Sequence, residues 1–228
     1  MRRALIILLL AALPLLAQQQ PAAPAPAQPP ATPPTIGPQQ FWAALLQGNQ
    51  GYVAGKIAYD NLKEERAMFK ENQLPPVTVL GCSDSRVPPE LVFNQSLGSL
   101  FIVRSAGNVV DDFGLASIEY AIAQGYTKLI VVLGHENCGA VKASLGGADP
   151  STPALRQLAT RIRTSFVGVP YDSRDPANVK KAIEANTRSS AAYLLAASTL
   201  VRDAEATDRI EIVTAYYSLT TGEVKKLD

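Results

Sequence analysis

Apolar and polar positions alternate along the chain in blocks that predict strands and helices in turn. Short runs rich in β-branched and apolar residues predict buried strands at 77–81, 100–104 and 128–134, because strands covered on both faces read as continuous apolar runs. Helices are predicted around these strands. Their ranges are 41–49, 60–72, 112–125, 138–145, 153–166 and 176–206. Residues 209–227 predict a final strand that turns at Thr221 and Gly222.

This order of elements predicts an α/β fold, a mostly parallel sheet flanked by helices in a single domain. No internal repeat or second linker interrupts the stretch from residue 41 to residue 228. In such folds, functional sites lie at the carboxyl ends of the parallel strands. The residues that directly follow the predicted strands are therefore the first candidates for chemistry.

The first 40 residues lack this alternation. Arg2 and Arg3 precede 14 apolar residues at 4–17, a pattern typical of a secretory signal peptide. The apolar run is shorter than the roughly 20 residues that a membrane-spanning helix needs. We expect cleavage after Ala17, with retention as a membrane anchor as the alternative. The mature protein is thus predicted to be exported, periplasmic or secreted, without a stable membrane span.

Residues 18–40 form a second stretch without periodicity. They contain 8 prolines, 6 glutamines and 5 alanines, a composition that cannot build a packed core. Proline fixes φ and removes backbone donors, which favours an extended chain. We predict a disordered linker over 18–40, followed by a folded domain over 41–228.

The overall composition narrows the function. Of the 228 residues, 47% are hydrophobic and 18% charged, which is enough for a domain with a sizeable core. The 21 basic and 20 acidic residues give a formal net charge of +1 without a basic block, which argues against nucleic-acid binding. Two cysteines and one histidine exclude a disulfide-dense framework and an array of zinc fingers.

The two cysteines and the histidine all fall at or near predicted strand ends. Cys82 follows the strand at 77–81, and His135 follows the strand at 128–134, with Cys138 three residues later. Two thiolates and one imidazole are a donor set typical of zinc. The sequence therefore predicts a Zn²⁺ site made by these three residues. A disulfide between the cysteines of an exported protein, or inert buried cysteines, are the alternatives.

A site with three protein ligands has an open fourth position, which favours catalysis over a structural role. Asp84 is the nearest carboxylate in the sequence, and Arg86 lies two residues further on. Asp84 either takes the fourth position in an inactive state or pairs with Arg86 and leaves that position to water. An ionised carboxylate held by an arginine accepts a hydrogen bond and orients a metal-bound hydroxide for attack. A simple loop salt bridge is the alternative for these two residues.

Several segments resemble the β-class carbonic anhydrases. These segments are LLQGNQGYVAGK at 45–56, CSDSRVPPE at 82–90, LFIVRSAGN at 100–108, VVLGHENCGAVKAS at 131–144 and AYYSLTTGEV at 215–224. The resemblance covers nearly all of 41–228 and implies the fold of that family, with 41–228 as its zinc-dependent catalytic domain.

The resemblance also implies an activity and an assembly. It implies zinc on Cys82, His135 and Cys138 and a catalytic dyad of Asp84 and Arg86. The implied reaction is the reversible hydration of carbon dioxide to bicarbonate and a proton by attack of zinc-bound hydroxide. The implied assembly is a homodimer or a dimer of dimers, with the active-site cleft at the subunit boundary.

Further residues match positions that contact substrate in the family. Gln73 stands where members carry a glutamine that hydrogen-bonds substrate, often from the neighbouring subunit. Phe101 and Tyr120 fall where members line the narrow cleft, and Gly139 matches the glycine after the second cysteine. These four residues are the predicted substrate-binding set.

One position departs from some members of the family. Val79 stands where members with an inhibitory, non-catalytic bicarbonate site carry tryptophan, although Arg104 matches the arginine of that site. We therefore do not expect bicarbonate inhibition of that kind.

Two other functions remain open at this point. A related zinc hydrolase acting on carbon disulfide or carbonyl sulfide could use the same ligands with a reshaped entrance. A non-catalytic zinc-binding protein would keep the ligands without turnover. Fold alone does not separate these functions, so substrate assays must.

Overall fold

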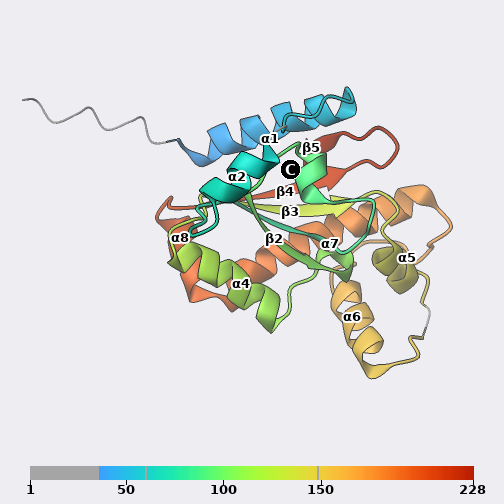
Figure 1. Ribbon diagram of the computed structural model, residues 1–228. Coiled ribbons are helices and arrows are strands. Elements are labelled where there is room, and N and C mark those ends of the chain that lie inside the picture. Colours follow the sequence, from blue (N-terminus) through green and yellow to red (C-terminus); the bar gives the residue numbers. More distant parts are fainter. Residues whose placement is uncertain (1–35, 60, 148) are drawn as a thin grey trace, which may run out of the picture. The chain divides into compact units, whose positions relative to one another are not determined.

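The computed structural model describes residues 36–59, 61–147 and 149–228 (Figure 1). The predicted signal peptide at 1–17 and residues 18–35 of the predicted linker lie outside the described residues. No helix in the described part of the chain is long and apolar enough to cross a membrane.

The centre of the fold is a five-stranded sheet with the strand order β2-β1-β3-β4-β5. The strands are β1 (Val77–Cys82), β2 (Leu100–Ser105), β3 (Leu129–His135), β4 (Glu211–Tyr217) and β5 (Val224–Lys226). The first four run parallel, and β5 pairs antiparallel with β4. The predicted mostly parallel α/β sheet is confirmed, and it places β1 and β3, with their carboxyl ends, side by side.

Helices cover both faces of this sheet (Figure 1). They are α1 (Pro38–Val53), α2 (Leu62–Met68), α3 (Pro89–Val92), α4 (Asp112–Ala123), α5 (Gly139–Leu145), α6 (Pro153–Arg163), α7 (Pro176–Ala197) and α8 (Thr199–Ala206). Val79 and Val131 pack in one apolar cluster with residues of α1 and α3. Leu80 and Val132 face the opposite way and pack with residues of α4, α7 and α8. Successive strand residues thus pack against the helices on opposite faces of the sheet. Both faces are apolar, which explains why the strands appear in the sequence as unbroken apolar runs.

The structure differs from the predicted elements at several boundaries. Helix α1 begins at Pro38, inside the predicted linker, and α2 is shorter than the predicted 60–72. The predicted helix at 176–206 is broken at Ser198, whose hydroxyl accepts a hydrogen bond from the Val201 N–H and caps α8. The predicted strand at 209–227 is the hairpin of β4 and β5.

Two short elements were not predicted at all. Helix α3 follows β1, and a single 3₁₀ turn, η1 (Ala106–Asn108), follows β2. The 3₁₀ turn follows its strand directly, and α3 begins after the loop that leaves β1 at Cys82. The 3₁₀ turn matters most, because it packs against β1, β3, α5 and α7 beside the predicted ligands.

Candidate metal centre

The fold brings the three predicted metal ligands together. Cys82 is the last residue of β1, His135 is the last residue of β3, and Cys138 directly precedes α5. Their ligand atoms all lie within 4.8 Å of one another. All three side chains are buried, with 5% or less of each residue exposed. Neighbouring parallel strands end at the same edge of the sheet, which is why residues 53 or more positions apart in sequence converge here.

The donor set fits a zinc ion. The sulfur atoms of Cys82 and Cys138 are 3.9 Å apart, too far for a disulfide bond of about 2.05 Å. Tetrahedral coordination with Zn–S bonds of about 2.3 Å would separate the two sulfurs by about 3.8 Å. The disulfide alternative therefore finds no support in this arrangement, and the sulfurs are spaced as a shared ion requires.

The histidine presents a free lone pair to the same point. Its Nδ1 lies 2.9 Å from the Glu136 carbonyl oxygen, which only accepts hydrogen bonds, so Nδ1 carries the hydrogen. The Nε2 of His135 is buried and has no hydrogen-bond partner within the described part of the chain. A buried nitrogen without a partner is costly. A metal ion at this point would satisfy it.

The two cysteine sulfurs lie within hydrogen-bonding distance of each other. The thiol of Cys138 donates to Cys82, and this bond lowers the pKa of Cys82, with help from the Gly107 N–H at 3.2 Å. The same bond, together with burial, raises the pKa of Cys138. A divalent cation between the sulfurs displaces the remaining proton, so we expect metal binding to release protons.

Asp84 and Arg86 form the predicted pair beside the ligands. Arg86 Nε donates to Asp84 Oδ1 at 2.9 Å, and Arg86 Nη2 donates to Asp84 Oδ2 at 2.7 Å. These hydrogen bonds hold the pKa of Asp84 well below its usual range. Asp84 Oδ2 also lies 3.9 Å from His135 Nε2. The carboxylate is thus ionised, turned to the arginine and within reach of a group bound at the metal position.

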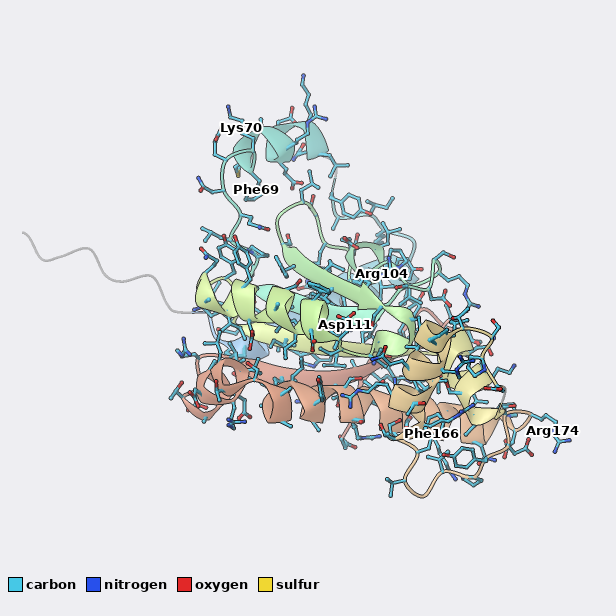
Figure 2. All side chains as sticks on the ribbon, turned by 90° about the horizontal axis from the view of Figure 1, so that it is seen from below. Phe69, Lys70, Arg104, Asp111, Phe166 and Arg174 are labelled. Carbon is cyan, nitrogen blue, oxygen red and sulfur yellow. The ribbon has the colours of Figure 1, made fainter. Side chains whose placement is uncertain are left out.

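Arg104 fixes the backbone that carries this pair. It projects from the edge strand β2 (Figure 2) and donates from Nε to the Cys82 carbonyl at 2.8 Å and from Nη2 to the Asp84 carbonyl at 2.6 Å. Two donors of this guanidinium are therefore engaged with the backbone on either side of Ser83.

Gly139 lines an apolar cavity next to Cys138. The cavity has a volume of about 350 Å³, and its walls include Ala106, Ala140, Ala143, Leu155 and Leu158. A Cβ at Gly139 would meet no other heavy atom within 4 Å in the described structure. Because Gly139 has no side chain, apolar space stays open beside Cys138. The contribution of α6 to this wall could not be read from the sequence.

The other three predicted substrate-binding residues lie elsewhere. Phe101 pairs in register with Thr78, and Ser105 pairs with Cys82. Four residues of strand, about 13 Å, therefore separate Phe101 from the level of Cys82. Tyr120 lies beside Phe101, with ring centroids 6.4 Å apart.

Gln73 is exposed and precedes β1 at the end opposite to Cys82. One chain therefore does not bring Gln73, Phe101 or Tyr120 to its own ligands.

Comparison with known proteins identifies the family. A family model described as carbonic anhydrase matches residues 77–224. Carbonic anhydrase 2 of Mycobacterium tuberculosis is 36% identical over 194 residues, which cover 83% of this chain and 92% of the relative.

Solved structures agree in fold. The β-carbonic anhydrase CafA of Aspergillus fumigatus has a TM-score of 0.67 at 25% identity, covering 82% of this chain and 90% of CafA. One of two tetrameric β-carbonic anhydrases from Sordaria macrospora has a TM-score of 0.65 at 24% identity, covering 83% of this chain and 97% of that chain. The fold and the side chains at its site define an α/β protein with a Cys–His–Cys set, able to hold a metal ion, at the carboxyl edge of its sheet. The chain belongs to the β-carbonic anhydrase family.

Proposed function

We propose that this protein is a zinc enzyme that catalyses the reversible hydration of carbon dioxide to bicarbonate and a proton. The observation that carries this proposal is the convergence of Cys82, Cys138 and His135, whose Nε2 has no hydrogen-bond partner among the residues that the structure describes. Family membership supplies the reaction class. A bound zinc ion supplies a nucleophile at neutral pH, because it lowers the pKa of a coordinated water toward 7.

Asp84 orients that nucleophile. Its carboxylate is ionised because Arg86 donates two side-chain hydrogen bonds to it. An ionised carboxylate accepts a hydrogen bond and cannot donate one, so it fixes the direction in which an O–H group next to it points. Arg86 is the residue that keeps the carboxylate in this state and this orientation.

The apolar cavity at Gly139 suits the substrate. Carbon dioxide carries no charge, and the cavity walls are mostly alanine and leucine, with Ser144, whose hydroxyl donates to the Ala140 carbonyl, as the one polar side chain of the lining. Bicarbonate, by contrast, is charged and is poorly held by such walls. The cavity thus favours entry of carbon dioxide and departure of the product.

Proton release takes place without a histidine shuttle. The chain has one histidine, and its Nδ1 is bonded to the Glu136 carbonyl while its Nε2 faces the cysteines. Histidine is the usual proton carrier near neutral pH. We therefore expect the proton to pass to buffer, so that turnover rises with buffer concentration.

Assembly and location complete the proposal. Gln73, Phe101 and Tyr120 are proposed to reach the active site of a neighbouring subunit in a homodimer or dimer of dimers. The tetrameric relatives from Sordaria macrospora support an oligomer. Export to the periplasm or beyond is proposed from the charge and apolar pattern of residues 1–17, and N-terminal sequencing of the mature protein tests it.

Metal analysis combined with stopped-flow measurement of carbon dioxide hydration tests the activity. The wild-type protein is expected to hold one zinc per chain and to accelerate hydration. Asp84→Asn is expected to keep its zinc and to lose about 10²-fold in rate, because the neutral amide no longer orients the nucleophile. Bound zinc without any acceleration of hydration would contradict the proposal and favour a non-catalytic zinc protein or another substrate.

A further inference from the structure

A buried asparagine connects α7 to the metal centre. Asn186 is 2% exposed, and its Nδ2 donates to the carbonyl oxygen of Gly107 at 2.6 Å. Burying an amide in a helix face that otherwise packs against apolar side chains is costly unless its hydrogen bonds are made. The two partners are 79 positions apart in the sequence, so this contact is a feature of the tertiary fold.

Gly107 in turn touches a predicted ligand. Its N–H donates to the sulfur of Cys82 at 3.2 Å. Gly107 has φ 67° and ψ 23°, a left-handed conformation that glycine adopts without strain. A Cβ at this position would lie 3.0 Å from Cδ1 of Ile162. The Gly107 backbone therefore has a left-handed conformation in close-packed surroundings. The direction of its N–H depends on the hydrogen bonds that hold this residue.

We infer that Asn186 is a positioning residue of the metal centre: it holds the Gly107 carbonyl so that the Gly107 N–H points at the Cys82 sulfur. This inference rests on the proposed zinc site. Asn186 lies outside the proposed ligand set, and its hydrogen bond goes to the backbone of Gly107. Its effect passes through one backbone residue, from the side-chain amide to the carbonyl of Gly107 and from the N–H of Gly107 to the thiolate.

The chemical consequence lies in the thiolate. An N–H bond to a thiolate stabilises its negative charge and reduces the electron density that it gives to a bound metal. Two thiolates already neutralise the formal charge of a divalent ion. A donor on Cys82 therefore restores part of the ion's capacity to acidify a coordinated water.

Asn186 could instead serve only to attach α7 to the 3₁₀ turn. The neighbouring residue provides a matched control for that role. Thr187 is fully buried on the same helix, and its hydroxyl donates to the Ile183 carbonyl within α7 rather than to the turn. Thr187→Val removes one buried hydrogen bond of α7 and leaves the contact between Asn186 and Gly107 in place.

The test compares Asn186→Ala with Thr187→Val in two metal readouts. For Asn186→Ala, competition with a chelator is expected to show zinc affinity reduced about 10- to 100-fold, because Cys82 without the fixed Gly107 N–H is less well oriented for the ion, and this loss outweighs the stronger donation by its sulfur. The cobalt-substituted variant is expected to show its sulfur-to-cobalt charge-transfer band at longer wavelength, because a thiolate without its donor gives up electrons more easily. Thr187→Val is expected to match wild type in both. Equal zinc affinity and an unmoved band in Asn186→Ala would overturn the inference.

A measurement on the wild-type protein covers the case in which Asn186→Ala does not fold. In ¹⁵N-labelled protein loaded with ¹¹³Cd, the Gly107 amide proton is expected to show scalar coupling to cadmium through the N–H···S bond. A Gly107 amide without this coupling would overturn the inference, while cadmium bound to both cysteines would leave the proposed ligand set intact. Failure of wild type to bind metal would overturn the proposed function and this inference together.

Discussion

The two ends of the central strands differ in how complete they are. At the carboxyl end, Cys82 is 5% exposed, His135 is fully buried, and each makes contacts with its neighbours that fix its direction. At the amino end, Tyr120 is 48% exposed and Gln73 is also exposed. Both ends carry residues that the family resemblance assigns to a single active site.

A single chain assembles the predicted ligands but not the predicted substrate-binding set around them. Parallel strands deliver their carboxyl ends to one edge of the sheet, so a single chain assembles the three ligands and the Asp84–Arg86 pair. The strand length of about 13 Å between Phe101 and the level of Cys82 keeps the other set away. If the two ends meet only between subunits, a change at one end of a chain leaves the other end of that chain intact and affects the active site of the neighbouring chain.

The largest effect is expected at the carboxyl end. Cys138→Ser removes a thiolate ligand, so we expect loss of stoichiometric zinc and a fall in hydration rate of at least about 10³-fold. Gln73→Ala, at the other end, is expected to keep one zinc per chain. Metal analysis of both purified variants checks this contrast, and loss of zinc in Gln73→Ala would show that the two ends are not separate.

A mixing experiment tests the connection between chains. Gln73→Ala alone is expected to lower the hydration rate about 10-fold or more, since positioning of substrate is lost. Co-expression of equal amounts of Gln73→Ala and Cys138→Ser chains gives mixed dimers in which one site has both zinc and the partner's glutamine. About one quarter of wild-type activity is then expected from random pairing in a symmetric dimer.

The same mixture can refute the shared site. If Gln73 served the site of its own chain, each mixed dimer would hold one site without glutamine and one site without zinc. Activity would then equal the mean of the two variants measured separately. Stopped-flow assays on the separate and mixed proteins, at the same total chain concentration, distinguish the two results.

A smaller effect is expected from the pH dependence of stability. Arg86 lowers the pKa of Asp84 in the folded protein below the unfolded value of about 3.9. The pair therefore stabilises the fold above that pH, and the stabilisation is lost as the pH falls through the lower pKa of the folded state. In metal-free protein, Arg86→Met is expected to reduce the free energy of unfolding at pH 7, with a difference from wild type that shrinks below about pH 4.

The chain supplies a matched control for this pair. Asp172 and Arg174 have the same spacing and the same pattern of bonds, with Arg174 Nε donating to Asp172 Oδ1 at 3.1 Å. Their side chains are 41% and 91% exposed, against 16% and 50% for Asp84 and Arg86. Arg174→Met is expected to leave hydration activity unchanged, whereas Arg86→Met is expected to lower it. Equal effects of the two variants on activity would show that the pair at the metal centre has no special role.

The sequence predicts those residues of the candidate metal centre whose positions are set by the ends of strands. Cys82 and His135 each close a strand that is visible as an apolar run, and the rule that parallel strands end together places them side by side. The zinc-type donor set follows from residue chemistry alone. Each of these steps uses only residues close together in the sequence and one general property of α/β sheets.

The parts that escape prediction depend on distant contacts. Ser198 ends α7 although the helical pattern continues, because its hydroxyl caps α8 and also bonds Glu119. Asn186 bonds a turn 79 residues away. Its only signal in the sequence is a polar residue, next to Thr187, on a helix face that packs into the protein. Such a signal indicates a buried polar side chain but does not identify its hydrogen-bond partner.

Zinc K-edge X-ray absorption of the purified protein tests the central claim most directly. We predict two sulfur neighbours at about 2.3 Å and two lighter atoms, one of them a histidine nitrogen at about 2.0–2.1 Å, around one zinc per chain. Four sulfur neighbours, a shell of oxygen and nitrogen alone, or a protein without zinc would contradict the account.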